Sequence, residues 1–139
     1  MSSSNRSTPA IMHVMAGVLI DDLGRVLLAQ RPPGKHLAGA WEFPGGKREP
    51  DEAPLAALIR EWHEELAVTV KHASPLVHLP WRYAERELLL DAWLIEQWEG
   101  EPQSMEGQAL RWVKPATIDP LDLAPADRPI LEALLRISA

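Results

Sequence analysis

Apolar and polar positions fall into blocks along this chain, and the blocks predict a mixed α/β fold. Residues 12–20 are almost continuously apolar, as expected of a buried strand, and a polar turn at 21–24 leads into a second apolar run at 25–30. Other segments are shorter but are also rich in residues that favour strands. The predicted strands are residues 12–20, 25–30, 41–43, 68–79, 85–96 and 109–113.

Two longer segments repeat their apolar residues at the spacing of an α-helix. The first runs from about Glu52 to Leu66, and Pro54 suits its start because proline is tolerated in the first turn of a helix. The second covers residues 128–137, and residues 114–119 predict a short additional helix. The stripe of the first helix that we expect to be buried consists of Leu55, Leu58, Ile59, Trp62 and Leu66.

Proline and glycine separate these elements. Residues 31–40 contain prolines and glycines at both ends and must form a loop, and residues 44–46 read Pro-Gly-Gly. Residues 99–108 form a polar loop before the last predicted strand. Strands combined with two principal helices predict an α/β sandwich built on a mixed β-sheet.

The length of 139 residues indicates a single domain. Residues 1–10 are polar and rich in serine, and they lack the apolar core of a secretory signal. We therefore expect residues 1–10 to be a disordered tail and residues 11–139 to form the domain.

Charge and composition narrow the classes of partner. The net charge of −6 argues against binding to duplex nucleic acid or to an anionic membrane surface, so an anionic substrate needs local cations or a metal. No apolar run approaches the length of about 20 residues that spans a bilayer. The absence of cysteine excludes disulfides and thiolate metal sites, and it fits a reducing cytoplasm.

Three carboxylates on the first helix are the strongest candidates for chemistry. Glu61, Glu64 and Glu65 are spaced i, i+3 and i+4, so they share one face of the helix. Carboxylates crowded in this way repel each other unless a hard cation such as Mg²⁺ neutralises them. The alternative is an ordinary solvated acidic face supported by a neighbouring arginine.

The spacing around these glutamates is that of a known motif. Residues 46–68 follow the order Gly, five residues, Glu, seven residues, Arg-Glu, an apolar residue, one residue and Glu-Glu. This order resembles the Nudix box. The segments WEFPGGK at 41–47, WEGEP at 98–102 and EGQ at 106–108 are similar to the MutT branch of that family, over about residues 12–137. The box residues are Gly46, Glu52, Arg60, Glu61, Trp62, Glu64 and Glu65.

The resemblance implies a fold and an activity. The fold is a Nudix-type α/β/α sandwich, and the activity is Mg²⁺-dependent hydrolysis of a nucleoside triphosphate to the monophosphate and pyrophosphate, with Mn²⁺ as a substitute metal. Founding members of the branch remove oxidised nucleotides such as 8-oxo-dGTP before a DNA polymerase uses them. Sanitisation of the nucleotide pool, by a monomer or homodimer in the cytoplasm, is therefore the expected task.

The resemblance also implies roles for individual residues. Glu61, Glu64, Glu65 and Glu106 match metal-binding carboxylates, and Glu61 is the expected proton acceptor. Arg60 is expected to hold a glutamate in place, and Glu52 to brace the loop and helix. A backbone carbonyl of Gly45 or Gly46 is an expected further metal ligand. The residues expected to contact the nucleotide are Arg31, His36, Phe43, Arg86 and Asp127.

Three positions depart from the family pattern. Trp62 replaces the usual aliphatic residue, and Ala67 replaces a glycine that permits a left-handed backbone. Asp127 stands where the founding type has an asparagine that recognises the purine. An ionised Asp only accepts hydrogen bonds, so it could pair with N1–H and the 2-amino group of a guanine or with the 4-amino group of cytosine. A protonated Asp can imitate Asn and keep 8-oxo-dGTP as the substrate. Asp127 could instead simply cap the last helix.

Two other classes of protein remain as alternatives. One is a non-catalytic nucleotide-binding module, although such modules usually lose the box carboxylates. The other is a Nudix hydrolase that cuts a dinucleotide polyphosphate or a nucleotide sugar. Within the proposed class, a pyrophosphohydrolase for CTP or a modified dCTP competes with one for 8-oxo-dGTP.

Overall fold

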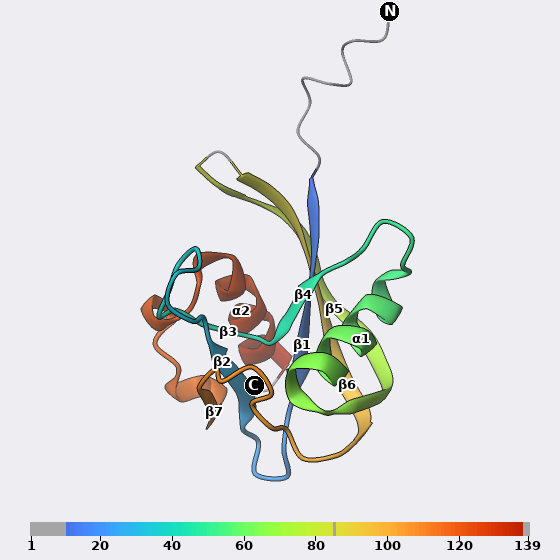
Figure 1. The fold of residues 1–139 in the computed structure, drawn as a ribbon. Coiled ribbons are helices and arrows are strands. Elements are labelled where there is room, and N and C mark those ends of the chain that lie inside the picture. The colour runs from blue at the N-terminus through green and yellow to red at the C-terminus, as the bar shows by residue number, and fades with distance from the viewer. Residues whose placement is uncertain (1–10, 85, 138–139) are drawn as a thin grey trace, which may run out of the picture.

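The computed structural model describes residues 11–84 and 86–137, and the predicted tail at 1–10 lies outside the described residues. The elements form a mixed α/β fold in which α1 and α2 lie on opposite sides of a central sheet (Figure 1). The strands are β1 (Met12–Leu19), β2 (Val26–Gln30), β3 (Trp41–Glu42), β4 (Gly45–Lys47), β5 (Thr69–Tyr83), β6 (Arg86–Glu99) and β7 (Leu110–Val113). The helices are α1 (Pro54–Leu66) and α2 (Arg128–Ile137), with short 3₁₀ turns η2 (Pro115–Thr117), η3 (Pro120–Asp122) and η4 (Pro125–Asp127).

The strands form two sheets. The larger has the order β4-β1-β6-β5, and β1 runs parallel to β6 while its other neighbour, β4, is antiparallel. The smaller sheet has the order β3-β2-β7 and is antiparallel throughout. The predicted α/β/α sandwich with a mixed sheet is confirmed.

Alternation along β1 explains the layers. Met15 and Leu19 pack with Leu58 and Trp62 of α1, while Ala16 and Val18 face the opposite way. Because successive side chains of a strand point to opposite faces, one strand serves two cores. The second core contains Ile130, Leu131 and Leu134 of α2 together with Val26 and Leu28 of β2.

Several predicted boundaries were wrong. The first helix begins at Pro54 rather than Glu52, because a residue before proline disfavours the helical backbone and Ala53 is extended. The expected helix at 114–119 is only the short turn η2. Strands β5 and β6 are longer than predicted and pair as one antiparallel hairpin. No helix within residues 11–84 and 86–137 is long and apolar enough to cross a bilayer.

The buried stripe of α1 also differs from the prediction. Ala57, Leu58, Trp62 and Leu66 are buried, whereas Leu55 is only partly buried and Ile59 is 36% exposed. The rotation of the helix is set by Trp62, whose ring lies against Gly17 of β1 and whose Nε1 donates to the carbonyl oxygen of Pro44 at 2.8 Å. A side chain at position 17 would collide with this ring, so Gly17 makes room for the unusual Trp62.

Candidate active site

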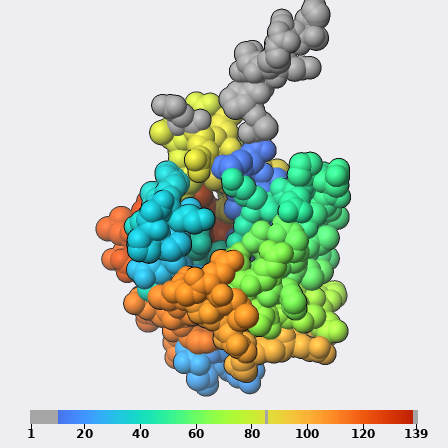
Figure 2. Space-filling view, in the orientation of Figure 1, coloured from blue at the N-terminus to red at the C-terminus, as the bar shows by residue number. Residues whose placement is uncertain are grey.

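A cavity of about 590 Å³ lies where α1, β1 and β4 meet the loop at 31–40 and the turn η4. Figure 2 shows the hollow between the 31–40 loop in cyan, α1 in green and the segment after β6 in orange. Of the residues expected from the sequence to form the site, only Arg60 does not line this cavity. Those that do are Arg31, His36, Phe43, Gly45, Gly46, Glu61, Glu64, Glu65, Arg86, Glu106 and Asp127.

One wall of the cavity is acidic. Glu61, Glu64 and Glu65 project from α1, and Glu106 reaches the same wall from the loop after β6. Hydrogen bonds hold that loop against the end of α1: the N–H of Gln103 donates to the carbonyl of Leu66 at 2.9 Å, and Gln108 donates through Nε2 to the carbonyl of Glu65 at 3.3 Å. The loop thereby adds a fourth carboxylate to the helix face.

The carboxylates of this wall repel each other. Burial raises the pKa of the Glu65 carboxyl well above its usual range, and a hydrogen bond with Glu61 and the negative charges of Glu61 and Glu106 raise it further. Such a cluster of partly buried oxygen ligands is the donor set that a hard divalent cation prefers. The chemistry of the wall therefore fits Mg²⁺ or Mn²⁺.

The two glycines of β4 allow the backbone to approach this wall closely. A side chain at Gly46 would overlap the carboxylate of Glu61, and one at Gly45 would overlap the backbone carbonyl of Met15. Gly45 and Gly46 pair with Ala16 and Met15 of β1. The main chain of β4 is thus placed beside the carboxylates, as the expectation of a carbonyl ligand requires, although the ligand itself stays a prediction.

Arg60 lies behind the acidic wall. Its Nε and Nη2 donate to both carboxylate oxygens of Glu52, at 2.6 and 2.8 Å, and its Nη1 donates to Glu61 at 2.9 Å and to Glu64 at 3.3 Å. The hydrogen bond from Arg60 lowers the pKa of Glu52 to about 2, and the bond to Glu52 raises the pKa of Arg60. The structure places Arg60 where it can orient two glutamates and Glu52 where it can anchor the arginine.

Asp127, at the end of the turn η4, is a buried residue of the same cavity. Its Oδ2 accepts a hydrogen bond from the backbone N–H of Phe43 at 2.7 Å, so this bond goes to the segment after β3 rather than to the first turn of α2. Burial, followed by the negative charge of Glu42, raises the pKa of Asp127 to about 8. This carboxyl is therefore mostly protonated at neutral pH.

The remaining predicted contacts lie around the rim. Arg31 pairs with Glu42 at 2.8 Å and donates to the backbone carbonyl of His36 at 2.6 Å, which ties the 31–40 loop to β3. Burial raises the pKa of Glu42, and Arg31 counteracts this. The ring of His36 meets Tyr83 edge-on at 5.1 Å, and Arg86 enters from the start of β6.

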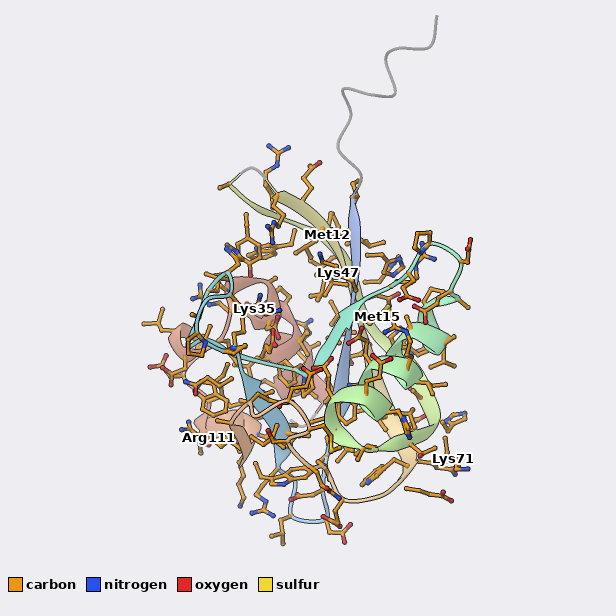
Figure 3. All side chains as sticks on the ribbon, in the orientation of Figure 1. Met12, Met15, Lys35, Lys47, Lys71 and Arg111 are labelled. Atoms are coloured by element: carbon orange, nitrogen blue, oxygen red, sulfur yellow. The ribbon has the colours of Figure 1, made fainter. Side chains whose placement is uncertain are left out.

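Four further ionisable residues of the cavity were not assigned a role from the sequence: Lys35, Glu42, Lys47 and Tyr83. Figure 3 shows Lys35 on the side of the 31–40 loop and Lys47 on the side of β4. Lys47 closes the WEFPGGK segment, so its motif was a signal for it. Glu42 belongs to the same segment, whereas Lys35 and Tyr83 come to the cavity from separate parts of the chain and had no motif to mark them.

A second group of possible metal ligands lies outside this cavity. Ligand atoms of His13, His78 and Asp91 are within 4.8 Å of one another. None of the three lines the cavity. Nε2 of His13 contacts Asp91 at 2.7 Å, while Nδ1 accepts from Nε of Arg48 at 3.1 Å, so both ring nitrogens already have partners. These contacts make the group a hydrogen-bonded network rather than an open ligand set.

Comparison with known proteins identifies the family. The NUDIX domain family matches residues 15–133, and the chain belongs to it. An Escherichia coli K12 protein named 8-oxo-dGTP diphosphatase is 33% identical over 126 residues, covering 91% of this chain and 98% of the relative. Another, named CTP pyrophosphohydrolase, is 40% identical over 129 residues, covering 93% and 95%. The protein is thus a Nudix hydrolase of the MutT-like branch, a family whose members generally depend on a divalent metal.

Solved structures agree with this assignment. The solution structure of the E. coli ORF135 protein has a TM-score of 0.82 at 38% identity, covering 95% of this chain and 96% of that one. The crystal structure of a MutT Nudix hydrolase from Burkholderia pseudomallei has a TM-score of 0.80 at 28% identity, covering 90% and 98%. The fold and family are therefore established over nearly the whole chain.

Proposed function

We propose that this protein hydrolyses a nucleoside triphosphate to the monophosphate and pyrophosphate in a Mg²⁺-dependent reaction. The observation that carries the proposal is that the acidic wall and the buried carboxyl of Asp127 line the same cavity. The acidic wall suits metal-bound phosphates, and the buried carboxyl suits the edge of a base. Such a small nucleotide substrate is consistent with the names of the relatives.

The residues supply the chemistry as follows. Glu61 accepts a proton from the attacking water, whose oxygen bonds to phosphorus while an anhydride P–O bond breaks and pyrophosphate leaves. Mg²⁺, when bound at the carboxylates, neutralises phosphate charge and polarises the phosphoryl group. Arg60 keeps Glu61 and Glu64 in position through its hydrogen bonds. Lys35 and Lys47 add positive charge to the cavity near the phosphates.

The first candidate base is an oxidised guanine. A protonated Asp127 offers an O–H donor, and its Oδ2 keeps a second lone pair beside the bond from Phe43. Donor and acceptor together match the O6 acceptor and the N7–H donor of 8-oxoguanine. In this arrangement Asp127 does the work of an asparagine, and the protein would sanitise the nucleotide pool of the cytoplasm.

The second candidate base is cytosine. The same protonated carboxyl can donate to N3 and accept from the 4-amino group, and the neighbouring carboxyl of Glu42 adds another acceptor for an amino group. The relative named CTP pyrophosphohydrolase is similar over nearly the whole chain. CTP, dCTP or a modified dCTP is therefore the substrate that competes with 8-oxo-dGTP.

Pyrophosphate release tests both parts of the proposal. The panel contains 8-oxo-dGTP, dGTP, CTP, dCTP and 5-substituted dCTP with Mg²⁺, and a dinucleotide polyphosphate and a nucleotide sugar are assayed for their own products. We expect turnover of a triphosphate that falls by at least about 100-fold in Glu61→Gln. A cytosine preference would retain the mechanism and change the substrate. Turnover of the dinucleotide or sugar alone, or of nothing with Mg²⁺, would overturn the proposal.

A further inference from the structure

A chain of hydrogen bonds leads from Asp91 of β6 to Arg60, which lies behind the acidic wall. It begins at Asp91, which is 5% exposed and accepts from Nε1 of Trp93 at 2.8 Å through Oδ1. Its other oxygen, Oδ2, lies 2.7 Å from Nε2 of His13 on the neighbouring strand β1. The buried carboxylate thus has one partner on its own strand and one on β1.

The partners of His13 determine which of its nitrogens carries the proton. Nδ1 accepts from Nε–H of Arg48 at 3.1 Å, because a guanidinium can only donate. Nε2 therefore carries the hydrogen that points to Asp91. The backbone N–H of Arg48 also donates to the carbonyl of His13 at 2.8 Å. His13 thus holds Arg48 by two contacts, one from the side chain and one from the backbone.

Arg48 passes this constraint to the loop between β4 and α1. Its Nη1 donates to the backbone carbonyl of Glu52 at 2.6 Å and lies 3.4 Å from the carbonyls of Glu49 and Pro50. One guanidinium therefore gathers three carbonyls of a tight turn. The turn closes on itself as well, since the N–H of Glu49 donates to the side chain of Glu52 at 2.9 Å.

Glu52 connects this loop to the acidic wall. Its carbonyl is held by Arg48, and its carboxylate receives both hydrogen bonds from Arg60. Arg60 in turn donates to Glu61 and Glu64. Residues that hydrogen-bond to metal ligands fix the orientation of those ligands. Mutation of such a residue typically lowers metal affinity or activity by about 10–100-fold.

We propose that His13 and Arg48 are positioning residues that set the metal affinity of the acidic wall through Glu52 and Arg60. The inference rests on the proposed function in that it assigns the wall to a divalent metal. Neither residue touches that wall, and Arg48 does not line the cavity. The nearby His78 is exposed, and its ring lies 6.3 Å from that of His13 without joining the hydrogen-bonded path.

Binding of Mn²⁺, followed by electron paramagnetic resonance without any substrate, tests the proposal on the whole chain. We expect Arg48→Met to weaken Mn²⁺ binding by about tenfold, at the lower end of the range for such partners. His78→Gln is the matched control and should leave Mn²⁺ affinity unchanged. In an Arg60→Met background, Arg48→Met should add little, because both variants break the same path.

A second pair of variants guards against simple misfolding. His13→Gln keeps one donor and one acceptor at the end of the side chain and should retain most of the Mn²⁺ affinity, whereas His13→Leu removes both and should lose affinity like Arg48→Met. Thermal unfolding without metal identifies variants that do not fold. Unchanged Mn²⁺ affinity in folded Arg48→Met, or full multiplication of its effect with Arg60→Met, would overturn the inference.

The two proposals fail in different ways. Shifted Mn²⁺ affinity without turnover of any triphosphate would leave the positioning role intact and contradict the proposed activity. Turnover of a triphosphate, with equal Mn²⁺ affinity in Arg48→Met and His78→Gln, would leave the proposed activity intact and contradict the positioning role. No Mn²⁺ binding by the unmodified protein would contradict both.

Discussion

At the scale of single residues, Asp127 is a carboxyl whose protonation depends on its burial. It is 8% exposed, it accepts from the backbone of Phe43, and it lines the cavity. The N–H of Phe43 and the charge of Arg31 favour an ionised Asp127, but burial and the charge of Glu42 outweigh them. Burial in the folded chain therefore favours the protonated form of Asp127 without any bound nucleotide.

The retained proton predicts how stability depends on pH. The pKa of Asp127 is about 8 in the folded state against 3.8 for an ordinary aspartate, so the folded protein holds a proton that the unfolded chain has lost between these values. The stabilisation is complete below about pH 4 and is lost as the pH rises through about 8. Relative to wild type, Asp127→Asn should gain stability over this window, since its amide still accepts from Phe43 and does not titrate.

Urea unfolding at several pH values between 4 and 9 measures this difference. Between pH 4 and pH 9, the free energy of unfolding of Asp127→Asn should rise relative to that of wild type by at least about 1.4 kcal/mol. This is the energy that corresponds to a pKa difference of one unit between the folded and unfolded states. Asp122→Asn, at an exposed acid in the preceding turn, serves as the control. Parallel pH profiles for wild type and Asp127→Asn would contradict the prediction.

At the scale of elements, the C-terminal end of α1 carries a conformation that its residue does not favour. Ala67 is left-handed, with φ 57° and ψ 30°, and its N–H donates to the carbonyl of His63 at 3.1 Å. The next N–H, that of Val68, lies 3.4 Å from the carbonyl of Trp62. The helix thus ends as it would with glycine, and the alanine bears the steric cost expected from the sequence.

Replacing this alanine should stabilise the protein. Ala67→Gly removes a left-handed penalty of about 1–2 kcal/mol and adds about 0.5–1 kcal/mol of unfolded-state entropy, for a net gain of roughly 0.5–1 kcal/mol. Ala56→Gly is the control at an exposed position in the first turn of α1, and it should lose stability, by less than the roughly 1 kcal/mol of a helix interior. Urea unfolding of both variants decides the matter, and a loss of stability in Ala67→Gly would show that its turn is not strained.

The elements that the sequence predicted well are those with a strong local pattern. The continuous apolar run of β1 and the helical spacing of α1 follow from neighbours in the chain. Ile59 was misplaced because the rotation of α1 depends on Gly17, a residue of another element that leaves space for Trp62. Spacing within one helix cannot contain that information.

The candidate site divides in the same way. Glu61, Glu64 and Glu65 are predictable because one helix carries them, and the resemblance supplied Glu106, Arg31 and Asp127. Lys35, Tyr83 and the path through Arg48 were missed, since each depends on loops and strands that meet only in the folded chain. Their assignment requires coordinates rather than a pattern.

At the scale of the whole molecule, the acidic wall predicts a coupling between metal binding and stability. Burial and the charges of Glu61 and Glu106 disfavour an ionised Glu65 in the folded protein, which raises the pKa of its carboxyl. A cation that binds only the folded state stabilises it, by about 1.4 kcal/mol at ten times its dissociation constant. Thermal unfolding with and without Mg²⁺ therefore reports on the wall directly.

Glu65→Gln should separate the two effects. In chelator the variant should unfold at a higher temperature than wild type, because a neutral amide avoids the cost of burying an ionisable carboxyl beside Glu61 and Glu106. With Mg²⁺ the wild type should gain thermal stability and the variant much less. Equal gains in the two proteins would place the cation elsewhere, and a less stable variant in chelator would show that Glu65 is not a source of repulsion.

The position of β1 determines when this protein can assemble. β1 is the neighbour of β4 and runs parallel to β6, with Met12 opposite Leu88 and Leu19 opposite Ile95. A ribosome adding about 5–20 residues per second completes α1 several seconds before it has made the far end of β6. During that interval β4 is available as a neighbour of β1, but β6 is not. The four-stranded sheet therefore cannot be completed until residues 86–99 have left the ribosome.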